Sequence, residues 1–285
     1  VYASSSSVYG SNKKVPYSTD DKVDNPVSLY AATKKSNELM AHAYSKLYNI
    51  PSTGLRFFTV YGPAGRPDMA YFGFTNKLRN NETIKIFNYG NCKRDFTYID
   101  DIVEGVSRVM KKAPERKTGE DGLPIPPYAV YNIGNSHPEN LLEFVDILQQ
   151  ELINAGVLPE DYDFEAHKEL VAMQPGDVPV TYADTSALER DFGFKPSTSL
   201  RDGLREFARW YKEFYIDWGW VYMMINDKIR YPNGKMPIFQ KYYRKYNLTH
   251  NVVLKPLYKV LFVFFRNRRF IKMSVDTKIG DGLYL

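Results

Sequence analysis

The sequence predicts an α/β fold, because segments typical of strands alternate with segments typical of helices along residues 1–216. A strand at residues 1–3 is expected to deliver the serine run at residues 4–7 to its carboxyl end. Ligands bind at that end of the strands in open α/β sheets. The segment 28–48 is typical of a helix, and 52–56 is typical of the next strand.

The same alternation continues after this first strand, helix and strand. The other expected elements are helices at 71–80, 99–111, 141–155 and 200–214, and strands at 84–87 and 129–133. Polar segments at 20–26 and 114–127 predict surface loops, and the turn-rich segment 62–67 is suited to wrapping a ligand. In the last helix, apolar residues at helical spacing predict a face in the core: Leu204, Phe207, Trp210, Tyr211 and Phe214.

Composition excludes several classes of protein. Of the 285 residues, 44% are hydrophobic and 25% are charged, as is usual for globular chains. The single cysteine, Cys92, excludes an internal disulfide framework and is consistent with a cytoplasmic location. The four histidines, His42, His137, His167 and His250, show no metal-ligand spacing, so no metal site is expected.

Charge is distributed unevenly along the chain. Residues 217–285 hold 13 basic and 4 acidic residues, a balance of +9, whereas residues 1–216 hold 25 basic and 29 acidic residues, a balance of −4. The basic excess therefore belongs to the tail, which argues against a nucleic-acid-binding protein. This change of composition predicts two domains, 1–216 and 217–285.

One constellation in the first domain indicates chemistry. Tyr30 and Lys34 lie one turn apart on a predicted helix and therefore share a face. A lysine cation near a tyrosine favours the phenolate, and a serine can help to relay the proton. Such a Tyr/Lys pair alone is usually a surface pair, and serine clusters are usually caps or turns. Their order and spacing here favour removal of a proton from an alcohol or sugar hydroxyl while hydride leaves the same carbon.

An ordered series of motifs carries a resemblance over roughly residues 1–216. The series comprises Val1-Tyr-Ala-Ser-Ser-Ser-Ser-Val-Tyr-Gly10, Ser28-Leu-Tyr-Ala-Ala-Thr-Lys34, Gly54-Leu-Arg-Phe-Phe-Thr-Val-Tyr-Gly-Pro63, Gly65-Arg-Pro-Asp-Met-Ala70, Arg94-Asp-Phe-Thr-Tyr-Ile-Asp-Asp101, Tyr131-Asn-Ile-Gly134 and Gln174-Pro-Gly-Asp-Val178. It resembles the NAD-dependent epimerase/dehydratase family of extended short-chain dehydrogenase/reductases. Within that family the chain is most similar to the UDP-glucuronate 4-epimerases.

The resemblance implies a role for each matching residue. Ser5 resembles the catalytic serine or threonine, Tyr30 the base, and Lys34 the residue that binds the nicotinamide ribose, so that NAD is the implied cofactor. The remaining matches concern a UDP-sugar substrate: Ser6, Ser7, Thr59 and Arg66 around its carboxylate, Arg94 at the pyrophosphate, and Asp177 near the uridine ribose.

The two arginines in this set also have simpler structural explanations. Arg66 could be a solvated loop residue, and Arg94 could form a salt bridge with the neighbouring Asp95. The functional alternative is chemically sound, since a guanidinium fork binds carboxylates and phosphates through paired hydrogen bonds.

Departures from the related motifs favour one reaction. Dehydratases of this family carry an Asp-Glu pair where this chain has Ser6 and Ser7, and UDP-glucuronate decarboxylases tend to carry a glutamate at the second position. Thr59 stands where epimerases of neutral hexoses usually carry asparagine. The resemblance therefore implies interconversion of UDP-glucuronate and UDP-galacturonate through an NAD-dependent 4-keto intermediate. A UDP-glucuronate decarboxylase, another UDP-sugar epimerase and a non-catalytic UDP-sugar-binding module remain the alternatives.

The chain contains no Gly-x-Gly-x-x-Gly pattern, the phosphate-binding turn of dinucleotide folds. By resemblance, that turn lies upstream of Val1. The expected fold is therefore a partial Rossmann-like, doubly wound parallel sheet with a small C-terminal α/β subdomain that binds substrate. We expect this chain alone to bind NAD weakly and to be inactive, and the intact enzyme to form a homodimer through the helix of Tyr30.

The tail permits three interpretations. It is rich in aromatic and basic residues, with a possible helix at 236–246 and an apolar stretch at 252–265 that is too short to span a bilayer. It could lie on an anionic membrane or dock a partner. The favoured interpretation is that Thr277-Lys-Ile-Gly-Asp-Gly-Leu-Tyr-Leu285 resembles the opening of a left-handed β-helix acyltransferase.

Overall fold

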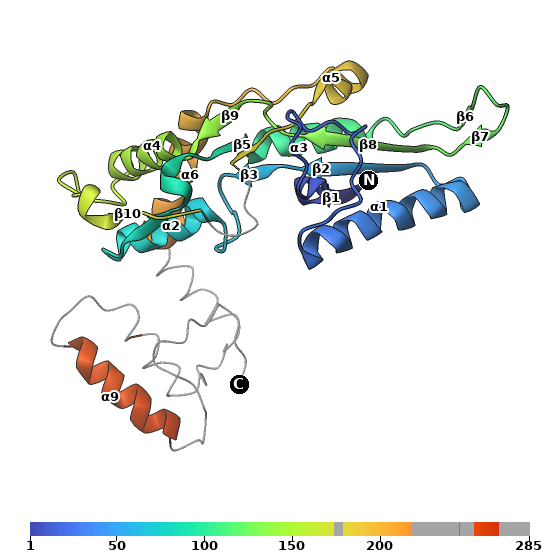
Figure 1. Ribbon diagram of the computed structural model, residues 1–285. Helices are drawn as coiled ribbons and strands as arrows, with labels where there is room; N and C mark the ends of the chain where they lie inside the picture. The colour runs from blue at the N-terminus through green and yellow to red at the C-terminus, as the bar shows by residue number, and fades with distance from the viewer. Residues whose placement is uncertain (174–178, 218–244, 246–253, 268–285) are drawn as a thin grey trace. The chain divides into compact units, whose positions relative to one another are not determined.

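The computed structural model describes residues 1–173, 179–217, 245 and 254–267, and the chain divides into two compact units, Val1–Tyr211 and Lys212–Leu285 (Figure 1). The first unit contains the elements with which the expected site residues are associated. Asp177, one of those residues, lies outside the described residues.

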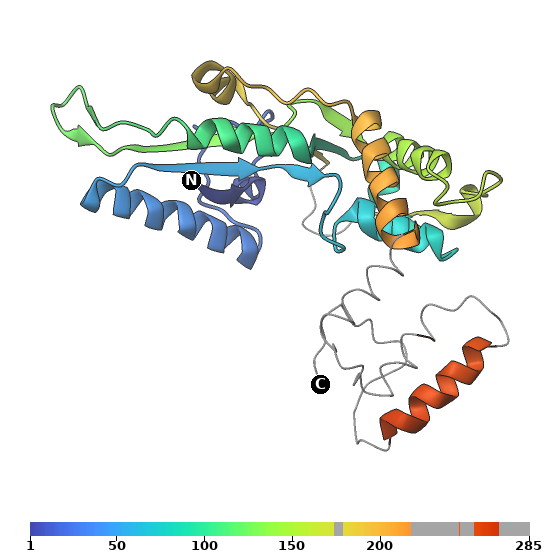
Figure 2. The same cartoon turned by 180° about the vertical axis from the view of Figure 1, so that it is seen from behind.

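A three-stranded parallel sheet in the first unit has the order β1-β2-β8. Its strands are β1 (Tyr2–Ser5), β2 (Ser52–Phe57) and β8 (Tyr128–Ile133). The helix α1 (Leu29–Tyr48) covers one face, and α3 (Ile99–Met110) and α5 (Ser186–Phe192) cover the other (Figures 1 and 2). Successive strand residues point to opposite faces. Leu55 and Ile133 therefore pack against Ile102 and Leu188 from α3 and α5.

Local signals fix both ends of α1. The Ser28 hydroxyl accepts a hydrogen bond from the Ala31 backbone N–H at 3.1 Å, which satisfies one of the free donors of the first turn. Asn49 ends the helix in the left-handed conformation, with φ of 55°. The face against the sheet buries only Ala31, Glu38 and Ser45, at intervals of seven residues. These are small or polar residues, so α1 contributes little apolar area to the core.

A second group of strands continues the first unit. Strands β3 (Thr59–Tyr61), β5 (Lys93–Tyr98) and β11 (Val180–Thr181) are parallel in the order β11-β5-β3, with β9 (Pro138–Asn140) antiparallel to β5. Two further parallel strands are β4 (Ile84–Ile86) and β10 (Lys168–Leu170), and short 3-10 helices are η2 (Phe87–Gly90) and η3 (Glu165–His167). Because β3 follows β2 after one residue, the two groups of strands are directly connected.

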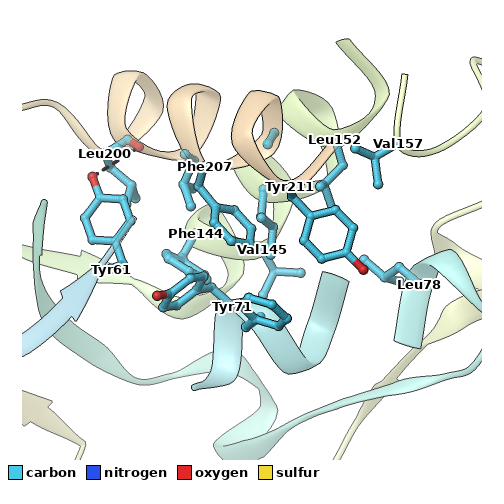
Figure 3. Close-up of a cluster of buried hydrophobic side chains, with 14 of the residues drawn as sticks. Tyr61, Tyr71, Leu78, Phe144, Val145, Leu152, Val157, Leu200, Phe207 and Tyr211 are labelled. Atoms are coloured by element: carbon cyan, nitrogen blue, oxygen red, sulfur yellow. Dashed lines mark hydrogen bonds between the residues drawn. The ribbon is translucent and has the colours of Figure 1, made fainter. Parts of the chain in front are cut away.

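The largest hydrophobic cluster of the described residues lies between this second group of strands and three helices (Figure 3). These helices are α2 (Ala70–Arg79), α4 (Leu141–Asn154) and α6 (Leu200–Lys212). Phe96 and Phe144 stack with ring centroids 4.2 Å apart, and the Tyr61 hydroxyl donates to the Leu200 carbonyl oxygen at 3.4 Å. Gly203 allows α6 to approach Tyr61, since a Cβ there would lie 2.2 Å from the Tyr61 hydroxyl oxygen.

The structure confirms the α/β class, the parallel strands and each helix predicted in the first unit. Segment 114–127 is largely exposed, as predicted for a surface loop, and it contains a short antiparallel hairpin, β6 (Lys117–Thr118) and β7 (Pro124–Ile125). One prediction was wrong in detail. The last helix ends at Lys212 and is followed by a π-helix, η4 (Glu213–Asp217), so Phe214 lies beyond α6. Of the other predicted core residues, Leu204, Phe207 and Tyr211 are buried and Trp210 is partly buried.

In the second unit the structure describes α9 (Leu254–Asn267). Pro256 does not interrupt this helix because it lies in the first turn, where the missing backbone donor is not needed. No helix within the described ranges has the length and apolar character to cross a bilayer. The possible helix at 236–246 falls almost entirely, and the acyltransferase-like segment entirely, outside the described residues.

Candidate active site

A turn rich in hydroxyl groups follows β1. Ser5 ends the strand and caps the 3-10 helix η1 (Ser6–Tyr9), its hydroxyl accepting a hydrogen bond from the Ser7 backbone N–H at 3.2 Å. Gly10 closes the turn with φ of 56°, and a Cβ there would lie 2.1 Å from the Asn25 carbonyl oxygen. The Ser7 hydroxyl is buried and has no hydrogen-bond partner among the described residues. A buried hydroxyl without a partner is costly, so a ligand group that reached it would stabilise the turn.

Tyr30 and Lys34 lie in the first two turns of α1. This helix packs against β1 and against the turn formed by Ser5 and η1, hereafter the serine turn. The Lys34 ammonium is 5.7 Å from the centroid of the Tyr30 ring, and it donates to the Ala3 carbonyl oxygen at 3.2 Å. Lys34 therefore connects the helix to β1 immediately before the serines. An ammonium has three donors, so this contact leaves others for a ligand.

A pocket of about 430 Å³ opens beside Tyr30. Its lining combines apolar side chains at the start of β3 and α2 with the backbone of a glycine-containing loop: Tyr30, Phe58, Val60, Tyr61, Gly62, Pro63, Ala64, Gly65, Arg66, Met69, Tyr71 and Ile99. Gly62 has φ of 136°, which only glycine adopts readily, and a Cβ on it would lie 2.6 Å from Ile99. The pocket brings together two of the predicted site residues, Tyr30 and Arg66.

Arg66 is both a loop residue in solvent and part of the pocket lining. Its side chain is 73% exposed, and Nε lies 3.5 Å from the equally exposed Asp68 carboxylate. An exposed pair at this distance contributes little stability. The guanidinium is therefore free to exchange Asp68 for an anionic ligand at small cost.

Thr59 and Arg94 lie outside the pocket lining. Thr59 begins β3 between two lining residues, Phe58 and Val60, and pairs in register with Phe96 of β5. Arg94 lies on β5, where its Nη1 donates to the carbonyl oxygens of Lys93 and Pro179 at 3.1 and 3.3 Å. The structure thus groups Tyr30 with Lys34 and with Arg66, and places Arg94 on a separate strand.

Asp95, the neighbour of Arg94, organises the backbone of two loops. Its buried carboxylate accepts hydrogen bonds from the backbone N–H groups of Asn135, Ser136 and Ala183 at 2.7, 3.1 and 3.0 Å. Burial raises the pKa of Asp95, and these backbone hydrogen bonds offset part of that effect. This carboxylate therefore holds the segment after β8 against the segment after β11.

Two groups of residues around the site were not predicted from the sequence. One is the apolar lining of the pocket, which has no sequence signal beyond the turn-rich segment 62–67. The other is a buried ion pair between Glu38 of α1 and Arg56 of β2. Its signal was available, since Glu38 lies two turns after Tyr30, and Arg56 is a charged residue within a predicted buried strand.

Comparison with known proteins finds relatives that match about three quarters of the chain. The model of the NAD dependent epimerase/dehydratase family matches residues 1–134. Protein CapI of Staphylococcus aureus is 54% identical over 221 residues, which cover 75% of this chain and 63% of that protein. UDP-glucuronate 4-epimerase 4 of Arabidopsis thaliana is 48% identical over 221 residues, covering 75% of this chain and 48% of that protein.

Among solved structures, UDP-glucuronic acid 4-epimerase from Bacillus cereus in complex with UDP-glucuronic acid and NAD is 32% identical, with a TM-score of 0.60. The match covers 75% of this chain and 61% of that one. The chain thus spans 48% to 63% of the length of the two curated relatives described above. The Rossmann-like class predicted from the sequence is confirmed by this structural match. Residues 1–134 match the model of the NAD dependent epimerase/dehydratase family, which confirms the resemblance seen in the sequence.

Proposed function

We propose that this chain provides the sugar-binding and proton-transfer groups of a UDP-glucuronate 4-epimerase, which interconverts UDP-glucuronate and UDP-galacturonate. The observation that carries the proposal is the pocket that brings Tyr30, a candidate base, together with Arg66, a candidate carboxylate ligand. The names of the relatives support the same substrate.

In this proposal Tyr30 removes the proton of the sugar C4 hydroxyl, and Ser5 relays it. Lys34, whose ammonium lies 5.7 Å from the centroid of the Tyr30 ring, favours the phenolate that acts as base. Bound NAD would supply the acceptor, and later the donor, of the hydride at C4. When the 4-keto sugar presents its other face, hydride returns to C4 and Tyr30 returns the proton to the C4 oxygen, so the configuration is inverted and no atom is lost.

The substrate carboxylate is assigned to Arg66 with the hydroxyls of Ser6, Ser7 and Thr59. A guanidinium and hydroxyl donors suit a carboxylate, and the Ser7 hydroxyl is buried without a partner among the described residues. Fixing the carboxylate keeps the 4-keto acid from losing CO₂. The serine turn offers no carboxylate for elimination chemistry, which disfavours a dehydratase or a decarboxylase. For the nucleotide, we assign Arg94 to the pyrophosphate and Asp177 to the uridine ribose.

The residues that suit NAD in this chain are Tyr30 and Lys34, since the ammonium has donors to spare for ribose hydroxyls. The phosphate-binding glycine turn is not part of this sequence. We therefore expect the chain alone to bind UDP-sugars more readily than NAD.

A carboxylate ligand at Arg66 predicts selectivity between two substrates. Arg66→Met should weaken binding of UDP-glucuronate about tenfold to a hundredfold, because a hydrogen bond to a charged group contributes about 1.5 to 3 kcal/mol. Binding of UDP-glucose should stay within about twofold, since it lacks the carboxylate. Isothermal titration calorimetry with both ligands measures the difference.

Arg209→Met is the matched control for this substitution. Arg209 is similarly exposed, at 65%, and it pairs with an exposed glutamate on α6, outside the pocket lining. The control should leave both affinities unchanged. Equal affinity of the unsubstituted chain for UDP-glucuronate and UDP-glucose would reject the uronate site. Binding of UDP alone, with no contribution from the sugar, would favour the non-catalytic alternative.

We also propose that the protein forms a homodimer through α1. The face of α1 opposite Glu38 exposes Leu29, Met40 and Leu47 by 83%, 56% and 72% at helical spacing. Helices from two copies could bury these side chains against each other. Sedimentation equilibrium should give a dimer that Met40→Glu dissociates, and a monomer at micromolar concentration would exclude this interface.

A further inference from the structure

A row of buried polar residues crosses the sheet beneath the serine turn. Ser4 of β1, Arg56 of β2 and Asn132 of β8 are direct register partners, and each side chain is at most 3% exposed. They point to the face covered by α1, because their neighbours Leu55 and Ile133 point to the opposite face. Three polar residues in one buried row require partners for every donor and acceptor.

Glu38 of α1 provides the partner for two of the three. Its carboxylate accepts both Nε and Nη2 of Arg56, at 2.8 and 2.9 Å, and the Ser4 hydroxyl at 2.6 Å. The two guanidinium contacts form a paired, fork-like arrangement with fixed geometry. Lys35 adds a longer contact at 3.4 Å from the edge of the helix.

The third donor group of Arg56 reaches the far end of the serine turn. Nη1 donates to the Tyr9 hydroxyl at 3.0 Å, and that hydroxyl donates to Asn132 at 2.7 Å. Asn132 in turn donates to the Tyr17 carbonyl oxygen at 2.7 Å. The turn from Ser5 to Ser7 therefore lies between two anchored residues, Ser4 and Tyr9, and both anchors lead to the same ion pair.

Stability alone does not explain a buried ion pair at this position. Both charges are buried, and a buried ion pair is often no more stabilising than apolar residues of the same volume. Its hydrogen bonds, however, join α1 to both ends of the serine turn. The benefit is a fixed relative position of two elements that carry different parts of the site.

We infer that Glu38 and Arg56 are positioning residues, which fix the serine turn against the helix of Tyr30 and Lys34 so that both sets of groups meet the same sugar. The inference rests on the proposed function, since the sugar is its ligand. Neither residue contacts the pocket; each acts through Ser4, Tyr9 or α1.

The test compares the contribution of the sugar to binding in two variants. In Glu38→Gln the ratio of the dissociation constant of UDP to that of UDP-glucuronate should fall roughly tenfold, because the serine turn no longer meets the sugar correctly. The dissociation constant of UDP itself should stay within about twofold. A general loss of stability would change both constants together, so the ratio separates positioning from unfolding.

Glu151→Gln is the matched control. Glu151 is equally buried and pairs with Arg201 at 2.8 Å, but on α4 and outside the pocket lining. The control should preserve the ratio. If Glu38→Gln also preserves it, the inference is wrong. If Glu38→Gln does not fold, Glu38→Met combined with Arg56→Met removes both charges at similar volume and is subject to the same expectation.

Hydrogen exchange tests the positioning pair independently of any ligand. Amides of residues 5–9 and 29–34 should exchange roughly tenfold faster in Glu38→Gln and at the original rate in Glu151→Gln. Unchanged exchange in both segments would overturn the inference even if UDP-glucuronate binds. Faster exchange in a chain that shows no sugar contribution would leave the positioning pair intact and reject the proposed function alone.

Discussion

Replacing Tyr30 with phenylalanine is expected to slow epimerisation about 10²-fold to 10⁴-fold, the usual contribution of a general base. The substitution removes one hydroxyl from a side chain that is 55% exposed, so the fold should not change. The affinity for UDP-glucuronate should fall much less than the rate, because Arg66 and the serine hydroxyls are still present. Product formation from UDP-glucuronate by the intact enzyme in the presence of NAD measures the rate.

Tyr44→Phe is the control for Tyr30→Phe. Tyr44 lies on the same helix and is similarly exposed, at 59%, but does not line the pocket. The control should retain full activity. If Tyr30→Phe keeps more than about a tenth of the activity, Tyr30 is not the base.

Replacing Arg56 with methionine is expected to lower the free energy of unfolding by about 3 kcal/mol at pH 7. The substitution leaves the buried Glu38 carboxylate without its fork of donors. This value is at the low end for a broken buried pair because Lys35 stays 3.4 Å from Glu38. Urea denaturation measures the change, and a loss below about 1 kcal/mol would mean that the pair is not coupled to folding.

The same substitution should change how stability depends on pH. Burial alone would raise the pKa of Glu38, but hydrogen bonds from Arg56 and Ser4 hold it below the ordinary value of 4.5. A carboxyl group whose pKa is lowered by folding stabilises the protein above its ordinary pKa and loses that contribution as the pH falls. The difference between the unsubstituted chain and Arg56→Met should therefore shrink below pH 4.5. A difference that does not change with pH would contradict the assignment of the charge to Glu38.

Local features of this fold were readable from the sequence. The interval between Tyr30 and Lys34 predicted a shared helical face, and the ammonium does lie over the Tyr30 ring. Ser28 likewise predicted the start of α1, and the apolar spacing in α6 predicted its buried face. Both features depend on neighbours within a few residues.

Long-range features were not readable in this way. The register that aligns Ser4, Arg56 and Asn132 joins segments about 50 and 75 residues apart, and sequence spacing does not encode it. Asp95 was considered as a salt-bridge partner for Arg94. Its main contacts instead are three backbone N–H groups from distant loops. Contacts with backbone groups cannot be predicted from the pattern of side chains in the sequence.

If Tyr30 and Arg66 act on one UDP-hexuronate, the products formed by the intact enzyme will show it. UDP-glucuronate is incubated with the intact enzyme and NAD, and the anomeric protons are followed by ¹H NMR. We expect the signal of UDP-galacturonate to grow to an equilibrium with the substrate, without release of CO₂. A UDP-pentose formed with CO₂ would instead identify a decarboxylase, and UDP-glucuronate that stays unchanged would contradict the epimerase proposal.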